Sequence, residues 1–397
     1  MEENLKQIKS SCLKVVLFGP ESSGKTTLSK DLADYYNTNW VKEYARDYLQ
    51  RKWDNEKKIC ELKDLLPIAK GQIKLENQLS KLANRILICD TDLLETKVYS
   101  ETYYDGYCDP ILEKYAKENH YDLYLLTNID VPWVKDDLRD KPDERENSFE
   151  IFKSELIKNT ILITESKIPV LMNIAEQSTS EAIKSAISAE KDGASGLMIL
   201  PPMRYKASDD ETVNYFKSIA QSTSLPIMIY NNPVDYKIEV TLEMFDQLLE
   251  YENIQAVKES TRDISNVTRI INYFGNRLKI MTGVDTLALE SLLMGAHGWI
   301  AGLVDAFPNE TVAIYKLQKA GRISDALEIY RWFLPLLELD INSKLVQNIK
   351  LAETYTGIGT ENVRPPRLPL DGDERKKVIN IIESSLKNRP DLSKYTY

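Results

Sequence analysis

The chain has 397 residues, which is long enough for two or three domains with separate cores, and a formal net charge of −10 at pH 7. Acidic and basic residues are mixed along it without a Lys/Arg-rich block, so the composition disfavours nucleic acid as the main partner. It shows no signal-peptide pattern and no apolar run of membrane-spanning length, and we therefore expect a cytoplasmic protein that does not contact membranes.

The cysteines are distributed unevenly: all four lie in the first third of the sequence, at Cys12, Cys60, Cys89 and Cys108. They show neither CxxC pairing nor a neighbouring histidine cluster, which argues against a zinc site or a disulfide framework. Their absence after Cys108 indicates two segments of different origin.

A phosphate-binding pattern, GxxxxGK[ST], occupies residues 19–26, between a predicted buried strand at 15–18 and a helical pattern that begins at residue 27. Glycines at both ends let successive backbone N–H groups point at phosphate oxygens, and the helix N-terminus adds partial positive charge. Lys25 is expected to reach the β- and γ-phosphates of ATP, and the Thr26 hydroxyl to hold Mg²⁺. A chance match in a Gly/Ser-rich turn is the alternative, and the flanking strand and helix disfavour it. The predicted nucleotide-binding residues are Gly19, Ser22, Ser23, Gly24, Lys25, Thr26 and Thr27.

Strand and helix patterns alternate through the rest of this segment, which predicts a parallel sheet with ligands at the carboxyl ends of its strands. The strand patterns span residues 39–43, 85–90 and 123–126, and a helical pattern spans 62–83. Asp90 ends a buried strand, and we predict that it completes the Mg²⁺ environment, directly or through water. The alternative for Asp90 is a cap on the following helix.

The polar stretch at residues 128–145 carries two arginines, Arg139 and Arg145. In a small-molecule kinase such a segment can close as a lid that places guanidinium groups on the transferring phosphoryl. A solvated loop with surface ion pairs is the alternative.

Four motifs in this segment resemble the ribosylnicotinamide kinase domain of bacterial NAD-regulator proteins, over about residues 12–158. They are GPESSGKTTL at 19–28, WVKEYAR at 40–46, CDTD at 89–92 and DVPWVKDDLR at 130–139. The resemblance implies phosphorylation of nicotinamide riboside to nicotinamide mononucleotide, with ATP and Mg²⁺ as cofactors. Transfer to the 5′-hydroxyl needs a carboxylate that accepts its proton. Glu43 is our candidate, and Asp92 is the alternative.

The family domain normally ends with one more strand and helix after the lid helix. Here the pattern fades after residues 149–156, so the last strand of the sheet is expected to be missing. Residues 160–164, TILIT, are the candidate substitute for that strand.

From residue 165 onward the spacing of apolar runs changes to that of a barrel of alternating strands and helices. The strand-like runs span residues 169–174, 196–200, 226–230, 254–258, 278–282 and 298–301, with amphipathic stretches such as 180–189 and 242–249 between them. Lys258 ends one of the buried runs. A desolvated lysine can form a Schiff base with a keto acid, whereas a lysine at a strand end can also extend its amine to solvent.

The second segment, from about residue 168 to the C-terminus, resembles the dihydrodipicolinate synthase/N-acetylneuraminate lyase family of class I aldolases. The matching motifs are LPIMIYNNP at 225–233, VKES at 257–260, GVD at 283–285 and GAHGWI at 295–300. The resemblance implies that Lys258 is the Schiff-base lysine, that Tyr230 shuttles protons beside it, and that a 2-keto acid is the substrate without a further cofactor.

Three departures from that family put its activity in doubt. The GTTGE motif that binds the keto-acid carboxylate is absent, Asp235 stands where the synthases carry a substrate-binding arginine, and PPMRY at 201–205 replaces the family's Pro-Tyr-Tyr. The predicted fold is thus an α/β protein: a P-loop kinase-type parallel-sheet domain at residues 1–160, then an incomplete (β/α)₈ TIM barrel at 165–397 that lacks its first two βα units.

We weigh three functions for this combination. The first is an ATP-dependent nucleoside kinase joined to an incomplete aldolase-type barrel, and the second is a Schiff-base lyase that carries the kinase segment as a passenger. In the third, the barrel remnant is a non-catalytic surface for homo-oligomerisation, because a partial barrel exposes strand edges. Both family patterns are cut near residues 158–168 without a Gly/Pro/Ser-rich linker, as expected from a deletion or assembly error that joined two neighbouring genes.

Overall fold

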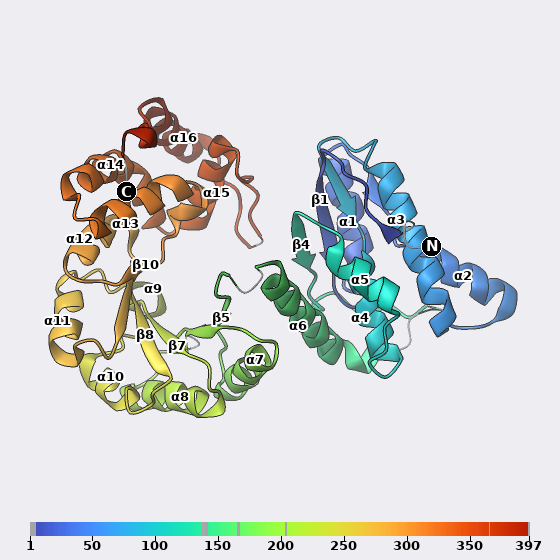
Figure 1. The fold of residues 1–397 in the computed structure, drawn as a ribbon, viewed down its shortest axis with the longest axis horizontal. Helices are drawn as coiled ribbons and strands as arrows, with labels where there is room; N and C mark the ends of the chain where they lie inside the picture. Colours follow the sequence, from blue (N-terminus) through green and yellow to red (C-terminus); the bar gives the residue numbers. More distant parts are fainter. Residues whose placement is uncertain are drawn as a thin grey trace. The chain divides into compact units, whose positions relative to one another are not determined.

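The structure is a computed structural model that describes residues 5–136, 138, 142–164, 167–202, 205–364 and 366–395 (Figure 1). The chain divides into two compact units, Met1–Ile168 and Pro169–Tyr397. Within the described residues no helix is long and apolar enough to cross a membrane.

The first unit is built on a parallel sheet whose described strands have the order β2-β3-β1-β4. Its strands are β1 (Leu13–Phe18), β2 (Trp40–Val41), β3 (Ile86–Cys89) and β4 (Leu123–Leu126). Its helices are α1 (Lys25–Tyr35), α2 (Tyr44–Glu56), α3 (Leu62–Leu79), α4 (Leu93–Tyr103), α5 (Pro110–Glu118) and α6 (Arg145–Ile163). The alternating strands and helices predicted for this segment are confirmed.

The centre of this sheet is strand β1, which pairs with β3 on one side and β4 on the other. Because helices cover both faces of a parallel sheet, its last residues are apolar without alternation, and Val16, Leu17 and Phe18 are fully buried. The Phe18 ring meets Phe152 of α6 edge to face, with centroids 4.9 Å apart. The parallel direction brings the carboxyl ends of β1, β2 and β3 to one edge of the sheet.

The strand expected at residues 160–164 is wrong, since these residues belong to the last turn of α6 and its C-cap. The Thr164 N–H donates to the Thr160 carbonyl over 3.0 Å. A helix that already extends from Arg145 gains one hydrogen bond for each residue added, which outweighs the β-propensity of a short Ile-Leu-Ile run. Leu162 and Ile163 consequently remain exposed on the helix.

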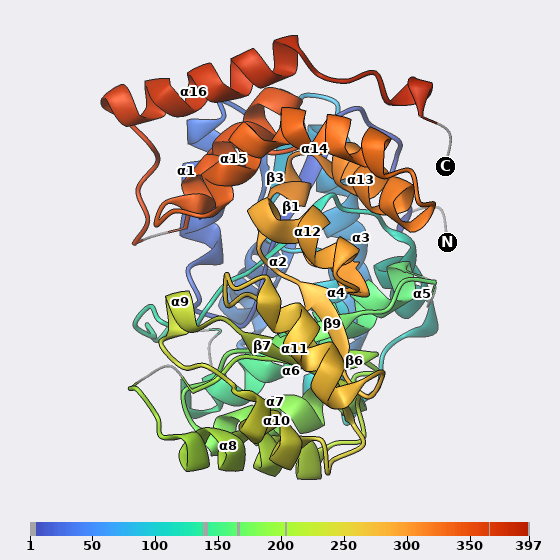
Figure 2. The ribbon, with the colours of Figure 1, turned by 90° about the vertical axis from the view of Figure 1, so that its left-hand side faces the viewer.

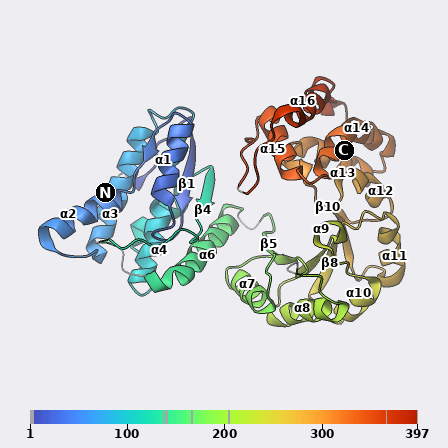
Figure 3. The same cartoon turned by 180° about the vertical axis from the view of Figure 1, so that it is seen from behind.

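The second unit contains a six-stranded parallel sheet in which spatial order follows chain order, from β5 to β10. Its strands are β5 (Leu171–Ile174), β6 (Gly196–Ile199), β7 (Ile227–Asn231), β8 (Ile254–Glu259), β9 (Lys279–Thr282) and β10 (Gly298–Trp299). The helices between them are α7 (Thr179–Lys191), α8 (Asp209–Ser222), α9 (Pro233–Tyr236), α10 (Leu242–Leu248), α11 (Ser265–Phe274) and α12 (Ala288–Leu293). Figures 1 and 3 show α7, α8, α10, α11 and α12 along the outer side of the sheet, which forms a half-barrel.

Four more helices complete this unit: α13 (Pro308–Lys319), α14 (Ile323–Leu337), α15 (Leu345–Thr356) and α16 (Gly372–Lys387). They enclose a second apolar core, in which Val378 and Ile382 of α16 are buried among residues such as Phe333 of α14. Figure 2 shows α16 lying across α14 and α15. The Tyr330 hydroxyl of α14 donates to the Asp285 carbonyl over 3.0 Å and so ties this bundle to the loop after β9.

We predict that the open edge of the half-barrel makes the protein self-associate. In the described residues β5 is an edge strand, paired with β6 alone, and its Leu171 is 45% exposed. Unpaired N–H and C=O groups beside apolar side chains are a template for pairing between copies. Sedimentation velocity over a range of concentrations should show oligomers, and Leu171→Lys should shift them towards monomer. A monodisperse monomer whose second unit melts cooperatively would mean that the half-barrel is a finished domain.

Candidate functional site

The loop between β1 and α1 has the backbone geometry that its glycines predict. Gly24 has a φ of +84°, in the left-handed region, and lies directly before the first residue of α1, Lys25. At Gly19 a Cβ atom would lie 2.5 Å from the Thr127 hydroxyl and 2.9 Å from its carbonyl oxygen. Larger side chains are therefore excluded at Gly24 by the left-handed backbone conformation, and at Gly19 by the close approach of Thr127, the residue that follows β4.

Neighbouring side chains hold this loop in place. The Ser23 hydroxyl lies 2.7 Å from both the Pro20 carbonyl and the Thr127 hydroxyl. From the polar stretch, the Val134 N–H donates to the Ser22 hydroxyl over 3.3 Å. The loop is thus held by Thr127, next to the sheet, and by Val134, in the segment predicted to be a lid.

The Lys25 ammonium points into the loop and has a protein acceptor for each of its three N–H groups. These acceptors are the carbonyls of Gly19 and Pro20, at 2.6 and 2.9 Å, and the Glu95 Oε1, at 3.1 Å. Lys25 is only 7% exposed, so these contacts are made away from bulk water.

A cavity of about 310 Å³ opens beside the loop. Its lining includes the run from Glu21 to Thr27 and a largely apolar and aromatic set of side chains. These side chains are Leu49, Ile59, Leu65, Ile68, Tyr99, Tyr103 and Tyr104, and the polar lining residues outside the loop include Glu43, Arg46, Gln72, Thr91 and Glu95. A site of this size and composition suits a flat aromatic ring joined to a polar group near the phosphates.

Asp90 lies at the carboxyl end of β3 and is 1% exposed, and neither of its carboxyl oxygens has a hydrogen-bond partner among the described residues. Burial raises the pKa of Asp90 to about 7; Glu43 adds to the rise, while the nearby Thr26 and Ser29 hydroxyls and the Lys25 charge oppose it. Orphaned carboxylate oxygens next to a threonine hydroxyl are hard donors of the kind Mg²⁺ takes, so these residues fit that ion.

Asp92, the alternative proton acceptor, has a different position from Glu43. Asp92 is fully buried, its Oδ1 accepts from the Glu95 N–H as the N-cap of α4, and its Oδ2 accepts from the Tyr124 hydroxyl over 2.6 Å. Burial raises the pKa of Asp92 to about 6 against these hydrogen bonds. The cap is therefore Asp92 and not Asp90, so the capping alternative for Asp90 is wrong.

Glu95 is a site residue that the motifs do not reveal. Burial raises its pKa well above the usual range although the Lys25 charge opposes this, and its Oε2 has no hydrogen-bond partner in the described part of the chain. The one available signal was helical spacing: Glu95, Tyr99 and Tyr103 are four residues apart and share the face of α4 that lines the cavity.

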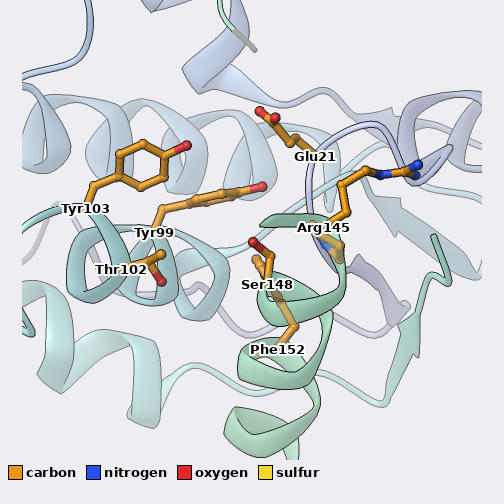
Figure 4. Close-up of a pocket in the computed structure, with 8 residues that line it drawn as sticks. Glu21, Tyr99, Thr102, Tyr103, Arg145, Ser148 and Phe152 are labelled. Carbon is orange, nitrogen blue, oxygen red and sulfur yellow. The ribbon is translucent and has the colours of Figure 1, made fainter. Parts of the chain in front are cut away.

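Of the two arginines in the segment predicted to be a lid, Arg145 lies against the phosphate loop: its guanidinium donates to the carbonyls of Ser22 and Val131 over 3.1 and 3.0 Å. Figure 4 shows Arg145, Ser148 and Phe152 of α6 and Tyr99 and Tyr103 of α4 around a small pocket, with the Arg145 guanidinium extending away from the two tyrosines. Arg139 lies outside the described residues. A third arginine, Arg46 on the cavity wall, pairs with Asp136 and so links α2 to the polar stretch.

In the second unit the parallel register of β7 and β8 places Tyr230 beside Lys258. The Lys258 ammonium lies 4.1 Å from the centroid of the Tyr230 ring. The Ser260 hydroxyl, at the end of β8, is buried without a hydrogen-bond partner in the described residues. The two residues carried over from the aldolase motifs therefore lie together at the carboxyl ends of the strands.

Carboxylates surround this lysine. Asp285 is buried, and its oxygens accept from the Trp299 indole and the Gly302 and Leu303 N–H groups, so it holds the loop after β10. Burial, with Asp285 nearby, raises the pKa of Asp340 to about 7. Asp235, where the synthases carry an arginine, pairs with the Asn232 amide over 2.8 Å. Among the described residues, these carboxylates place negative charge near Lys258, which disfavours binding of a keto-acid carboxylate there.

Models of two protein families match different parts of the chain. The AAA domain family matches residues 14–168, and the Dihydrodipicolinate synthetase family matches residues 150–385. The two matches overlap at residues 150–168, which contain most of α6.

Curated relatives of the second unit are 4-hydroxy-tetrahydrodipicolinate synthases. The chain is 28% identical to that of Bacillus velezensis over 58% of this chain and 80% of the relative, and 29% identical to that of Leptospira biflexa over 57% and 78%. A dihydrodipicolinate synthase structure from Bacillus anthracis superposes with a TM-score of 0.56 at 25% identity, over 59% of this chain and 80% of the other. About a fifth of each relative is left unmatched.

The half-barrel, the adjacent Lys258 and Tyr230, and these matches agree with one another. Over residues 14–168 the chain carries an AAA-type P-loop domain for nucleotide binding. Through residues 150–385 the chain belongs to the dihydrodipicolinate synthetase family.

Proposed function

We propose that the first unit is a small-molecule kinase that transfers the γ-phosphoryl of ATP to the 5′-hydroxyl of nicotinamide riboside. The single observation that carries the proposal is the cavity of about 310 Å³ whose walls are the phosphate loop and an aromatic surface. A nucleotide bound only through its phosphates would contact the loop and would leave the aromatic lining of the cavity unused. The four motifs that resemble ribosylnicotinamide kinases support this choice of acceptor.

In this proposal the residues divide the work of phosphoryl transfer. Lys25 and Arg145 offset charge on the transferring group, and Glu43 accepts the proton of the acceptor hydroxyl. The acceptor oxygen forms a bond to the γ-phosphorus as the bond from that phosphorus to the β,γ-bridging oxygen breaks, and ADP leaves with the electron pair. Thr26 and Asp90 would hold Mg²⁺, which when bound supplies further charge neutralisation.

Among the carboxylates of the site, Glu43 is the one suited to accept the proton. It lies at the N-terminus of α2, lines the cavity, and makes no capping hydrogen bond to that helix. Asp92, by contrast, is committed to its cap and to Tyr124. We therefore keep Glu43 as the base.

The test of this function is an acceptor screen on the full chain with Mg²⁺ and ATP, in which ADP release is measured for nicotinamide riboside, other nucleosides and water. We expect release with nicotinamide riboside well above that with water. If another nucleoside gave the highest rate, the kinase class would hold and the substrate would be corrected. Release equal to that in water for every acceptor would refute the proposal.

A second candidate function is a keto-acid lyase or synthase that uses a Schiff base on Lys258. The family membership of residues 150–385 and the contact between Lys258 and Tyr230 favour it. We propose that this activity is lost or very weak, because the two βα units that normally precede β5, and the carboxylate-binding motif within them, are missing. The half-barrel would then contribute mainly an oligomerisation surface.

For the half-barrel we predict that pyruvate and borohydride will not label Lys258 stoichiometrically. Without groups that bind the keto-acid carboxylate, the carbonyl is not held near the amine, and orientation contributes much of the rate of such reactions. Intact-protein mass spectrometry measures the adduct, with Lys258→Arg as the control for labelling elsewhere. Complete labelling together with turnover of an aldol substrate would establish the lyase.

A further inference from the structure

The ion pair between Lys25 and Glu95 joins the phosphate loop to the cavity beside it, which are the proposed sites for the nucleotide phosphates and for the acceptor. Lys25 belongs to the phosphate loop, and Glu95 lines the cavity beside it. All three N–H groups of the lysine already have acceptors: two loop carbonyls and the Glu95 carboxylate. A phosphate oxygen can bind Lys25 only if it displaces at least one of them.

Glu95 is the acceptor that a phosphate displaces with the greatest consequence. The loop carbonyls are neutral, whereas the carboxylate is an anion 3.1 Å from the ammonium that the phosphates need. A nucleotide bound at the loop would bring like charge close to Glu95 in a buried site, where water screens it poorly. The Oε2 of Glu95 is already without a hydrogen-bond partner among the described residues.

We infer that Glu95 is a positioning residue: it holds the phosphate-loop lysine in the nucleotide-free protein, and its carboxylate takes up one proton from solvent when nucleotide phosphates draw Lys25 away. The inference rests on nucleotide binding at the loop, as the proposed function does, but not on the identity of the acceptor.

Apart from Lys25, the charged neighbours that act most strongly on Glu95 favour this uptake. Glu43 from the end of β2 and Asp92 from the start of α4 are negative neighbours that raise its pKa, as burial does, and the lysine is the neighbour that lowers it. Tyr99, on the next turn of α4, is half-buried. Burial also raises the pKa of its phenol, so this side chain is neutral near pH 7. Loss of the lysine contact therefore removes the neighbouring charge that favours the ionised form of Glu95.

The direction of the pH dependence follows from linkage. A group whose pKa is higher in the complex than in the free protein gains a proton on binding, so affinity falls as the pH rises between the two pKa values. For one proton the limit is about a tenfold weaker affinity per pH unit. In the Glu95→Gln variant this contribution is absent.

Calorimetry with a non-hydrolysable ATP analogue and Mg²⁺, run in buffers of different ionisation enthalpy, measures the proton uptake. On binding the analogue, wild-type protein should gain more protons than Glu95→Gln, by at most one proton. The variant should bind the analogue at least as tightly, and its affinity should depend less on pH. Comparing the two proteins cancels the protonation of the ligand and of Asp90. Equal uptake in both would overturn the inference, as would a folded Glu95→Gln variant that no longer binds the analogue.

The matched control is Glu155→Gln. Glu155 also forms a buried ion pair, with Lys97 of α4 over 2.8 Å, but Lys97 keeps Glu101 as a second partner and neither glutamate lines the cavity. This variant should take up protons as the wild type does, and a loss of uptake there would overturn the inference. Should Glu95→Gln fail to fold, Lys25→Met serves instead: its Glu95 has no lysine to lose, so we expect less uptake than in Glu155→Gln, and uptake as large as the Glu155→Gln value would contradict us.

An acceptor assay keeps this result separate from the proposed function. Proton uptake at Glu95 with no phosphorylation of any nucleoside would refute the kinase and leave the positioning role intact. Phosphorylation of a nucleoside, together with equal proton uptake in wild type and Glu95→Gln, would support the kinase and refute the positioning role of Glu95.

Discussion

Replacing Lys25 with alanine is expected to lower the rate of nicotinamide riboside phosphorylation by about 10²- to 10³-fold, the usual cost of losing one preorganised donor to developing charge. Lys25 is the first residue of α1, and its ammonium is held inside the phosphate loop. Its removal takes away one of the positive charges that the proposed mechanism places at the transferring group. Initial rates at saturating ATP, measured by ADP release, report the loss.

The matched control for this variant is Lys30→Ala, which removes an exposed lysine from the same helix. It should retain the wild-type rate. A Lys25→Ala protein that phosphorylates as fast as Lys30→Ala would place the reaction somewhere other than the phosphate loop. Loss of activity in both would point to a defect of α1 instead of the missing ammonium.

Glu43→Gln is expected to lower the same rate by about 10²- to 10⁴-fold, because a positioned general base contributes that much and an amide cannot accept the proton. The substitution keeps the size of the side chain, and since Glu43 makes no side-chain cap with α2, the helix should be unaffected. We therefore expect the fall in kcat with little change in the KM for ATP. Steady-state kinetics with both substrates varied separates these two parameters.

Asp47→Asn, an exposed acid in the first turn of α2, controls for the change in charge and should be near wild type. Asp92→Asn tests the alternative base. Because Asp92 caps α4 and accepts from Tyr124, we expect that variant to lose thermal stability. If Asp92→Asn were stable but inactive and Glu43→Gln were active, we would conclude that Asp92, and not Glu43, is the general base.

The strands of the sheets could be predicted because a buried parallel strand is a continuous apolar run. The runs at residues 15–18 and 123–126 correspond to β1 (Leu13–Phe18) and β4 (Leu123–Leu126). The same signal failed at residues 160–164, since a short apolar run does not distinguish a strand from the end of a helix. There the outcome depended on α6, which begins far upstream at Arg145.

The candidate site could be predicted only where a local motif defines it. Gly19, Gly24 and Lys25 act through contacts made within a few residues, and the structure brings them together as the pattern indicates. Glu95 could not be found in this way, because its importance comes from the direction of α4 relative to the loop. Likewise, the roles of Asp90 and Asp92 are separated by the N-cap that Asp92 forms on α4 and by its hydrogen bond from Tyr124.

The most direct test of our central claim, that the cavity beside the phosphate loop receives the phosphoryl acceptor, is transfer of label from γ-³²P-ATP to nicotinamide riboside by the full chain with Mg²⁺. We predict a labelled product that co-migrates with nicotinamide mononucleotide, present with wild-type protein and Lys30→Ala and strongly reduced with Lys25→Ala and Glu43→Gln. Label that appears only as inorganic phosphate, or a labelled nucleotide formed equally by all four proteins, would contradict it.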